Sequence, residues 1–149
     1  MSARFLRLLV SCVVVASPFA AADAQALDRA ALESWLERYG AAWEARDAGA
    51  AGDIFAEDAL YQETPFEEPH KGRAGIREYW SRVTADQRDI DFRFDVVPVT
   101  ANTGVARWSA KFRLESTGDT LELDGVFVLE FAADGLCTSL REWWHIREL

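Results

Sequence analysis

The strongest constraint on the fold is a change in the period of the apolar residues near the middle of the chain. Up to residue 83 apolar side chains recur at the three- and four-residue spacing of a helix face, and from residue 90 they alternate with polar side chains. A period of two is typical of strands with one buried face. Four such runs cover residues 90–96, 107–114, 121–131 and 136–146. Short turns join the last of them, so we predict long antiparallel strands.

The first half of the chain predicts three helices and one short strand. Helices are expected over residues 28–46, 48–55 and 72–82, and the strand over residues 59–63. A sheet with one apolar face must bury it, and these helices are available to cover it. Gly125, in mid-strand, predicts a kink or bulge that curves the sheet. The expected class is α+β: three N-terminal helices over a cone-shaped, curved antiparallel sheet with a cavity at its wide end.

The first 26 residues have the layout of a secretory signal peptide. Arg4 and Arg7 precede an apolar run over residues 8–16 that is too short to cross a bilayer, and small residues up to Ala26 offer cleavage sites. An uncleaved anchor is the alternative interpretation. We therefore expect a secreted or periplasmic protein, cleaved near Ala26, with one domain over residues 27–149.

Charge and cysteine content exclude several classes of partner. Without residues 1–26 the chain carries 14 basic and 24 acidic residues, which disfavours nucleic acid and anionic membrane surfaces. Cys12 would leave with the signal peptide, so Cys137 could form neither an intramolecular disulfide nor a cysteine-based zinc site. No glycine-rich phosphate loop or nucleotide signature is present, and we expect neither a cofactor nor a metal.

The stretch "YQETPFEEPH", residues 61–70, concentrates acid beside the first predicted strand. One interpretation is a solvated loop. In the other, Glu63 turns into a pocket while Glu67, Glu68 and His70 face water. We adopt the second as a hypothesis, since a carboxylate in an apolar cavity has a raised pKa that suits proton transfer.

Three stretches resemble a known family. They are "YGAAWEARDAGAAGDIFAEDALYQETPF", "HKGRAGIREYW" and "FAADGLCTSLREWW". On these the chain is similar to the SnoaL-like and ketosteroid-isomerase-like proteins of the nuclear transport factor 2-like superfamily, and the likeness implies their cystatin-like barrel. Members of the superfamily include isomerases, cyclases, dehydratases, epoxide hydrolases and non-catalytic binding modules, so the resemblance leaves the activity open.

The resemblance to ketosteroid isomerase assigns roles to individual positions. It places the oxyanion tyrosine of the first helix on Tyr39, the general-base carboxylate on Glu63 and a pocket tryptophan on Trp144. The second oxyanion donor of that family, a protonated aspartate, falls on Phe127, which cannot donate a hydrogen bond. Steroid-type enolisation is therefore not expected.

The residues suggest one catalytic arrangement. Glu63 would be the base, Tyr39 the donor to the developing oxyanion, and Glu142, which shares the parity of Trp144, a second carboxylate. The expected walls of the substrate site are Trp108, Phe112, Phe127 and Trp144. Trp143 has the opposite parity and would lie on an outer face that forms a homodimer.

Three functions remain open from the sequence. The first is proton transfer on a small, largely apolar, carbonyl-bearing molecule, of isomerase, cyclase or lyase type without a cofactor. The second is non-catalytic binding of a small ligand in the same cavity. The third is a dimeric interaction module whose cavity is filled by side chains.

Overall fold

The computed structural model describes residues 26–149, so the predicted signal peptide lies outside the described residues except for Ala26. The elements are α1 (Arg29–Ala45), α2 (Ala48–Asp53), β1 (Phe55–Gln62), β2 (His70–Lys71), α3 (Gly72–Val83), β3 (Gln87–Thr100), β4 (Thr103–Leu114), β5 (Thr120–Phe131) and β6 (Cys137–Glu148). The three predicted helices and the four long strands are all present. In the described part of the chain, no helix is long and apolar enough to cross a membrane.

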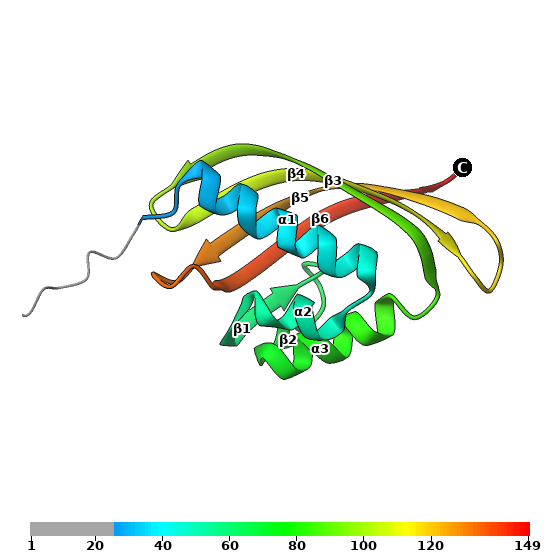
Figure 1. Ribbon diagram of the computed structural model, residues 1–149, viewed down its shortest axis with the longest axis horizontal. Coiled ribbons are helices and arrows are strands. Elements are labelled where there is room, and N and C mark those ends of the chain that lie inside the picture. The colour runs from blue at the N-terminus through cyan, green and yellow to red at the C-terminus, as the bar shows by residue number, and fades with distance from the viewer. Residues whose placement is uncertain (1–25) are drawn as a thin grey trace, which may run out of the picture.

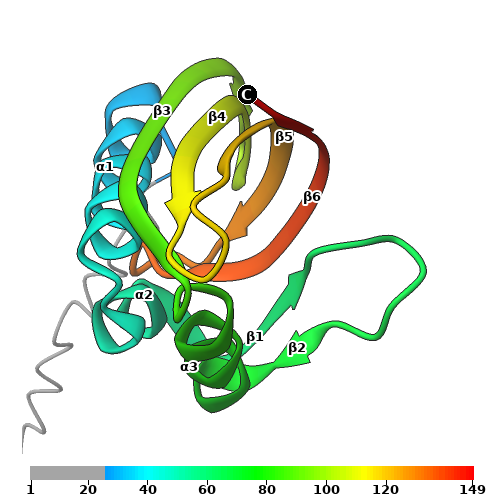
Figure 2. The same ribbon diagram turned by 90° about the vertical axis from the view of Figure 1, so that its right-hand side faces the viewer.

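The strands form one sheet in the order β2-β1-β6-β5-β4-β3. It curls strongly, and α1 runs along its concave side while α2 and α3 close it from below (Figures 1 and 2). The four long strands are antiparallel, as predicted. β1 departs from that pattern because it pairs in parallel with β6, which makes the sheet mixed. The predicted α+β cone is confirmed.

The acidic stretch forms a hairpin rather than an open loop. β1 begins at Phe55, four residues before the predicted start, and ends at Gln62, so Glu63 follows the strand directly. β2 returns antiparallel to β1, with Tyr61 opposite His70. A two-residue strand after a proline is too short to produce a periodic pattern, and this is why the sequence did not reveal it.

Of the kink or bulge predicted at Gly125, the bulge is absent. Pairing of β5 with β4 and β6 runs in continuous register through this residue, and the irregularities of the long strands lie elsewhere, as in β3 between Arg88 and Asp91. Gly125 instead allows a close approach. A Cβ atom here would lie 2.8 Å from Cε2 of Trp108 and 2.7 Å from the carbonyl oxygen of Trp143. The glycine thus leaves room for an indole on the concave face.

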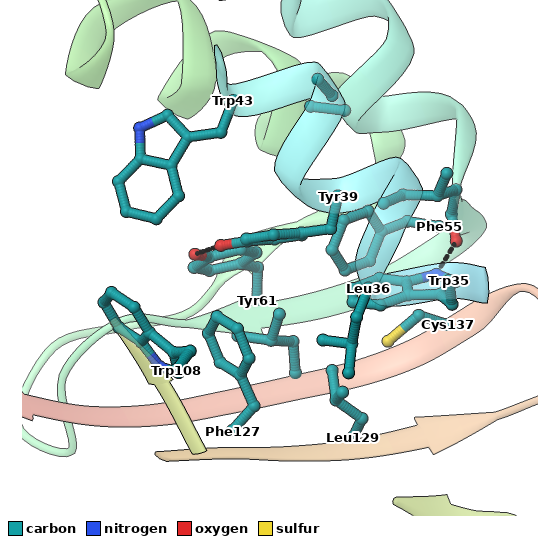
Figure 3. Close-up of a cluster of buried hydrophobic side chains, with 14 of the residues drawn as sticks. Trp35, Leu36, Tyr39, Trp43, Phe55, Tyr61, Trp108, Phe127, Leu129 and Cys137 are labelled. Atoms are coloured by element: carbon teal, nitrogen blue, oxygen red, sulfur yellow. Dashed lines mark hydrogen bonds between the residues drawn. The ribbon is translucent and has the colours of Figure 1, made fainter. Parts of the chain in front are cut away.

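The core lies between α1 and the concave face of the sheet (Figure 3). Asp28 caps α1 by accepting a hydrogen bond from the N–H of Ala31 at 2.8 Å. The helix then buries a stripe that includes Trp35, Leu36 and Tyr39. The indole N–H of Trp35 donates to the carbonyl oxygen of Ile54 at 2.9 Å, which joins α1 to the end of α2. This stripe fixes the position of Tyr39 above the sheet.

The outer face of the sheet carries cross-strand ion pairs, such as Arg107 with Asp124 at 2.8 Å. Exposed pairs of this kind contribute little to stability. Between them Trp143 keeps 48% of its surface exposed, opposite Val126 on β5.

Cys137 is buried, and burial raises the pKa of its thiol. It behaves as a small core residue.

Candidate active site

A cavity of about 170 Å³ lies inside the cone, between α1, α3 and the inner face of the sheet. Its lining combines carboxyl groups, tyrosines and indoles. The lining residues are Tyr39, Trp43, Tyr61, Glu63, Tyr79, Trp80, Val83, Gln87, Trp108, Phe112, Leu123, Glu142, Trp144 and Ile146. Six of the seven site residues predicted from the sequence are therefore in one place, although they come from α1, β4, β6 and the loop after β1.

A chain of hydrogen bonds crosses the buried side of this cavity. The hydroxyl oxygens of Tyr39 and Tyr61 are 2.9 Å apart (Figure 3), and the hydroxyl of Tyr61 donates to Oε1 of Glu142, also at 2.9 Å. Because Tyr61 has a single hydroxyl proton, it is Tyr39 that donates to Tyr61. The proton of Tyr39 is therefore engaged within the protein. This differs from the expectation that Tyr39 would offer its hydroxyl to a substrate oxygen.

Glu142 is the more deeply buried of the two carboxyl groups in the site, with 4% of its surface exposed. Alternation along β6 turns it inward with Leu140, while Arg141 and Trp143 face outward. Desolvation raises the pKa of Glu142 to about 8; the charge of Glu63 adds to the rise and the hydrogen bond from Tyr61 opposes it. At pH 7 this carboxyl is mostly neutral and has a proton to donate.

Glu63 lies in the same lining but is only half-buried. Desolvation raises its pKa, a hydrogen bond with Tyr79 lowers it, and the charges of Glu67 and Arg82 act in opposite directions. Water reaches Glu63 more easily than Glu142, so Glu63 is the more readily ionised of the two. The cavity thus holds two carboxyl groups in unlike surroundings.

The rest of the acidic stretch lies away from the cavity. Glu67 and Glu68 are exposed, as expected. His70 differs from the expectation of a solvated residue, because its ring stacks on Tyr79 at a centroid distance of 4.3 Å. Burial, followed by the charge of Arg82, lowers the pKa of His70. His70 therefore supports the tyrosine beside Glu63 rather than joining the lining.

Aromatic side chains form the walls. Trp108 and Phe112 from β4 line the cavity, and Trp144 from β6 lines it at a half-buried position. Phe127, the fourth expected wall residue, does not line it. It is fully buried and stacks against Trp108 at 5.0 Å, with Tyr39 on another side at 5.2 Å. Phe127 therefore packs behind Trp108 and Tyr39, which themselves line the cavity.

Several lining residues were missed by sequence reasoning. Tyr61 is two residues before Glu63, and in a strand this spacing places both side chains on the same face. That spacing could have indicated Tyr61 as a lining residue. Tyr79 and Trp80 belong to the apolar stripe of α3, which is equally typical of core packing. Gln87 is buried and accepts a hydrogen bond from the indole of Trp43 at 2.7 Å, and no pattern in the sequence marks it.

A larger cavity, of about 440 Å³, lies at the start of α1 and offers fewer groups for acid–base catalysis. Its two carboxylates are already engaged: Asp28 caps α1, and Asp134 accepts from the N–H of Leu136 at 3.0 Å. Across residues 26–149, no group of three or more histidine, cysteine, aspartate or glutamate side chains is placed to hold a metal ion. The smaller cavity is therefore the candidate active site.

Solved structures with this architecture define the fold class. The chain superimposes on an epoxide hydrolase/cyclase-like enzyme, SalBIII, with a TM-score of 0.71 and 17% identity, over 82% of this chain and 98% of that one. A Δ5-3-ketosteroid isomerase from Mycobacterium sp. gives a TM-score of 0.69 and 14% identity, over 80% and 98%. A hexachlorocyclohexane dehydrochlorinase, LinA type 2, gives 0.66 and 17%, over 81% and 88%. The protein therefore has the ketosteroid-isomerase-like fold of the nuclear transport factor 2-like superfamily.

The family assignment is narrower than the fold class. Residues 36–140, most of the described chain, match the SnoaL-like domain. The protein belongs to the SnoaL-like domain family, as the sequence resemblance predicted. No curated protein matches the sequence significantly.

Proposed function

We propose that this domain binds a small, largely apolar, carbonyl-bearing molecule and catalyses a proton transfer of the isomerase, cyclase or lyase type. One observation carries the proposal: Glu63 and Glu142 line a single cavity in unlike surroundings. Burial holds the pKa of Glu142 near 8, while Glu63 is half-buried beside water. Two carboxyl groups whose pKa values are set apart by their surroundings suit an acid and a base.

In the proposed reaction Glu63 is the base. Its carboxylate takes a proton from the carbon next to the carbonyl group, and the electron pair of that C–H bond moves into the new carbon–carbon double bond. The π electrons of the carbonyl group shift to its oxygen, where Glu142 donates its proton. General acid–base catalysis of this kind contributes on the order of 10²–10⁴-fold in rate.

The enol that forms then has two fates. In an isomerase, Glu63 returns its proton to another carbon of the conjugated system while Glu142 recovers the proton from oxygen. In a lyase, Glu142 recovers the proton from oxygen as the carbonyl group reforms. The electron pair of the enol double bond then forms a double bond to the next carbon, whose leaving group departs with its own electron pair and takes the proton from Glu63. The neighbours of similar fold include an isomerase, a cyclase-like enzyme and a dehydrochlorinase, which supports this range of reactions.

Glu142 takes over the role that the sequence suggested for Tyr39. Tyr39 donates a hydrogen bond to Tyr61, and Tyr61 donates one to Glu142, so the two tyrosines orient the acid. Phe127 provides no donor. A neutral carboxylic acid in a dry site is a strong donor to a developing oxyanion, and it replaces the absent aspartate in this scheme.

Non-catalytic binding in the same cavity is the alternative. It requires the aromatic walls but not the two carboxyl groups. The third possibility, an interaction module with a filled cavity, is disfavoured because about 170 Å³ stays open beside Glu142.

The experiment is hydrogen exchange in D₂O at the carbon next to the carbonyl group of a simple cyclic ketone, followed by NMR. Wild type is expected to accelerate exchange, and Glu63→Gln is expected to remove the acceleration by about 10²-fold or more while the protein stays folded. Glu68→Gln, in the exposed loop beyond Glu63, is the matched control and should behave as wild type, because Glu68 pairs with the exposed Lys71. Equal exchange rates in wild type and Glu63→Gln would rule out the role of Glu63.

We also propose that the mature protein is secreted or periplasmic and forms a homodimer. The layout of residues 1–26 supports export, and the half-exposed Trp143 opposite Val126 supports a second copy on the outer face. Sedimentation of wild type and Trp143→Ser tests the dimer, because the substitution should shift the protein towards monomer. N-terminal sequencing of the exported protein tests cleavage near Ala26.

A further inference from the structure

Resting on the proposed function, we infer that the substrate is an uncharged molecule with a single ring and one acceptor oxygen, which enters the cavity oxygen first. The volume of the cavity, the arrangement of its rings and the charges of its lining each restrict the ligand independently. Together they define a narrower class than any apolar carbonyl compound.

The volume sets the number of rings. A cavity of about 150 Å³ holds one benzene molecule, whereas sites for drug-sized ligands are about 300–1,000 Å³. The cavity here, at about 170 Å³, matches a single ring with a small substituent. A fused four-ring molecule exceeds this volume. The walls offer it little further surface, because Trp80 and Trp108 are almost fully buried.

The walls favour a flat ring. Trp43 stands nearly perpendicular to Trp80, at 84° and 5.6 Å between centroids, and at 61° to Trp108. Phe112 also lines the cavity, with its ring centroid 6.5 Å from that of Trp43. Rings set at steep angles form a box whose faces and edges contact a planar guest on several sides.

The charges of the lining disfavour an ion at the deep end of the cavity. No lysine, arginine or histidine is among the described lining residues, so a buried anion would have no opposite charge. A cation could pair with the ionised Glu63 only at the half-buried side of the cavity, and at the deep end it would require Glu142 to release the proton that burial holds on it. A neutral ligand with an acceptor oxygen takes that proton in a hydrogen bond and leaves the protonation state unchanged. Because Glu142 is the deeper carboxyl, the oxygen enters first.

Calorimetric titration at pH 7 with five probes tests this inference. The probes are cyclohex-2-enone (one ring), 2-tetralone (two rings), a four-ring steroid enone, cyclohexanecarboxylate (an anion) and cyclohexylamine (a cation). We expect the one-ring enone to bind at least about tenfold more tightly than each of the others. Equal or tighter binding of the steroid enone would overturn the size limit, and equal or tighter binding of either ion would overturn the neutral assignment.

Two variants make the size limit testable from the protein side. Phe112→Ala removes a wall of the cavity and should improve binding of 2-tetralone about tenfold. Phe55→Ala is the matched control, because Phe55 is fully buried on β1 but does not line the cavity, so its truncation should not favour the larger probe. If Phe112→Ala does not fold, Phe112→Leu at the same site gives a smaller shift in the same direction. No change of preference in a folded variant at residue 112 would contradict the inference.

These titrations separate the inference from the proposed reaction. Tight binding of the one-ring enone without hydrogen exchange would leave the ligand class standing and remove the catalytic role. Hydrogen exchange on a four-ring ketone would support the catalytic role and overturn the one-ring ligand class. Absence of binding by all five probes would overturn the inference.

Discussion

The hydroxyl of Tyr61 on β1 donates a hydrogen bond to Oε1 of Glu142 on β6, at 2.9 Å between oxygen atoms. The two residues are far apart in the sequence, and parallel pairing of β1 with β6 brings them together. Both side chains are almost fully buried. The hydrogen bond from Tyr61 orients the buried carboxyl, while desolvation keeps its proton on it, so that an acid is held in place inside an aromatic core.

The first prediction concerns the order of the hydrogen-bond chain. Tyr61→Phe should lower the free energy of unfolding by about 1–3 kcal/mol, because the buried hydroxyl of Tyr39 and the carboxyl of Glu142 both lose a partner. Tyr39→Phe should cost less, about 1 kcal/mol, since Tyr61 keeps its acceptor. Urea denaturation of the two variants beside wild type measures the difference. Equal losses would contradict the assigned direction of donation.

The second prediction is a pH dependence of stability. The pKa of Glu142 is about 8 in the folded protein against an ordinary value of 4.5, so between these values the folded state retains a proton that the unfolded state releases. Stability is therefore greatest below about pH 4.5 as far as this group is concerned, and it falls as pH rises towards 8. The slope from one such group is at most about 1.4 kcal/mol per pH unit.

Glu142→Gln isolates that contribution. The amide retains an acceptor oxygen for Tyr61 but does not titrate, so the unfolding free energy should vary less with pH between 5 and 8. Glu148→Gln, at the exposed end of the same strand, is the control and should keep the wild-type slope. Parallel curves for Glu142→Gln and wild type would show that the pKa of Glu142 is not raised.

The third prediction concerns Gly125. Gly125→Ala should destabilise the protein by about 1–3 kcal/mol and change the fluorescence of Trp108, because the added Cβ would lie 2.8 Å from Cε2 of that indole. Gly75→Ala, at the fourth residue of α3, places its Cβ 3.8 Å from the nearest neighbour and should stabilise by about 0.5–1 kcal/mol. Thermal unfolding of both variants measures the contrast. A neutral Gly125→Ala variant would contradict the close approach.

Much of the fold was predictable because one side chain in two along each long strand is apolar. Alternation placed Phe127 and Leu129 inside, and it placed Glu142 inside on β6, with Trp143 outside. These assignments need only local information. The parallel contact of β1 with β6 is non-local, and no turn sequence encodes it.

The sequence predicted which residues form the site better than it predicted the hydrogen bonds between them. Strand parity and the family resemblance together indicated Glu63, Glu142 and Tyr39. The hydrogen bond between Tyr61 and Glu142 depends on two strands meeting in a particular register, which the sequence does not reveal. The shift of the donor role from Tyr39 to Glu142 follows from that register.

The protonation state of the two carboxyl groups in one cavity is directly observable by ¹³C NMR titration of glutamate-labelled protein, with Glu142→Gln and Glu63→Gln used for assignment. We predict that the carboxyl of Glu142 titrates near pH 8 and that Glu63 titrates lower, though above its ordinary range. Titration of both groups near their ordinary value of 4.5 would contradict the proposed division into an acid and a base.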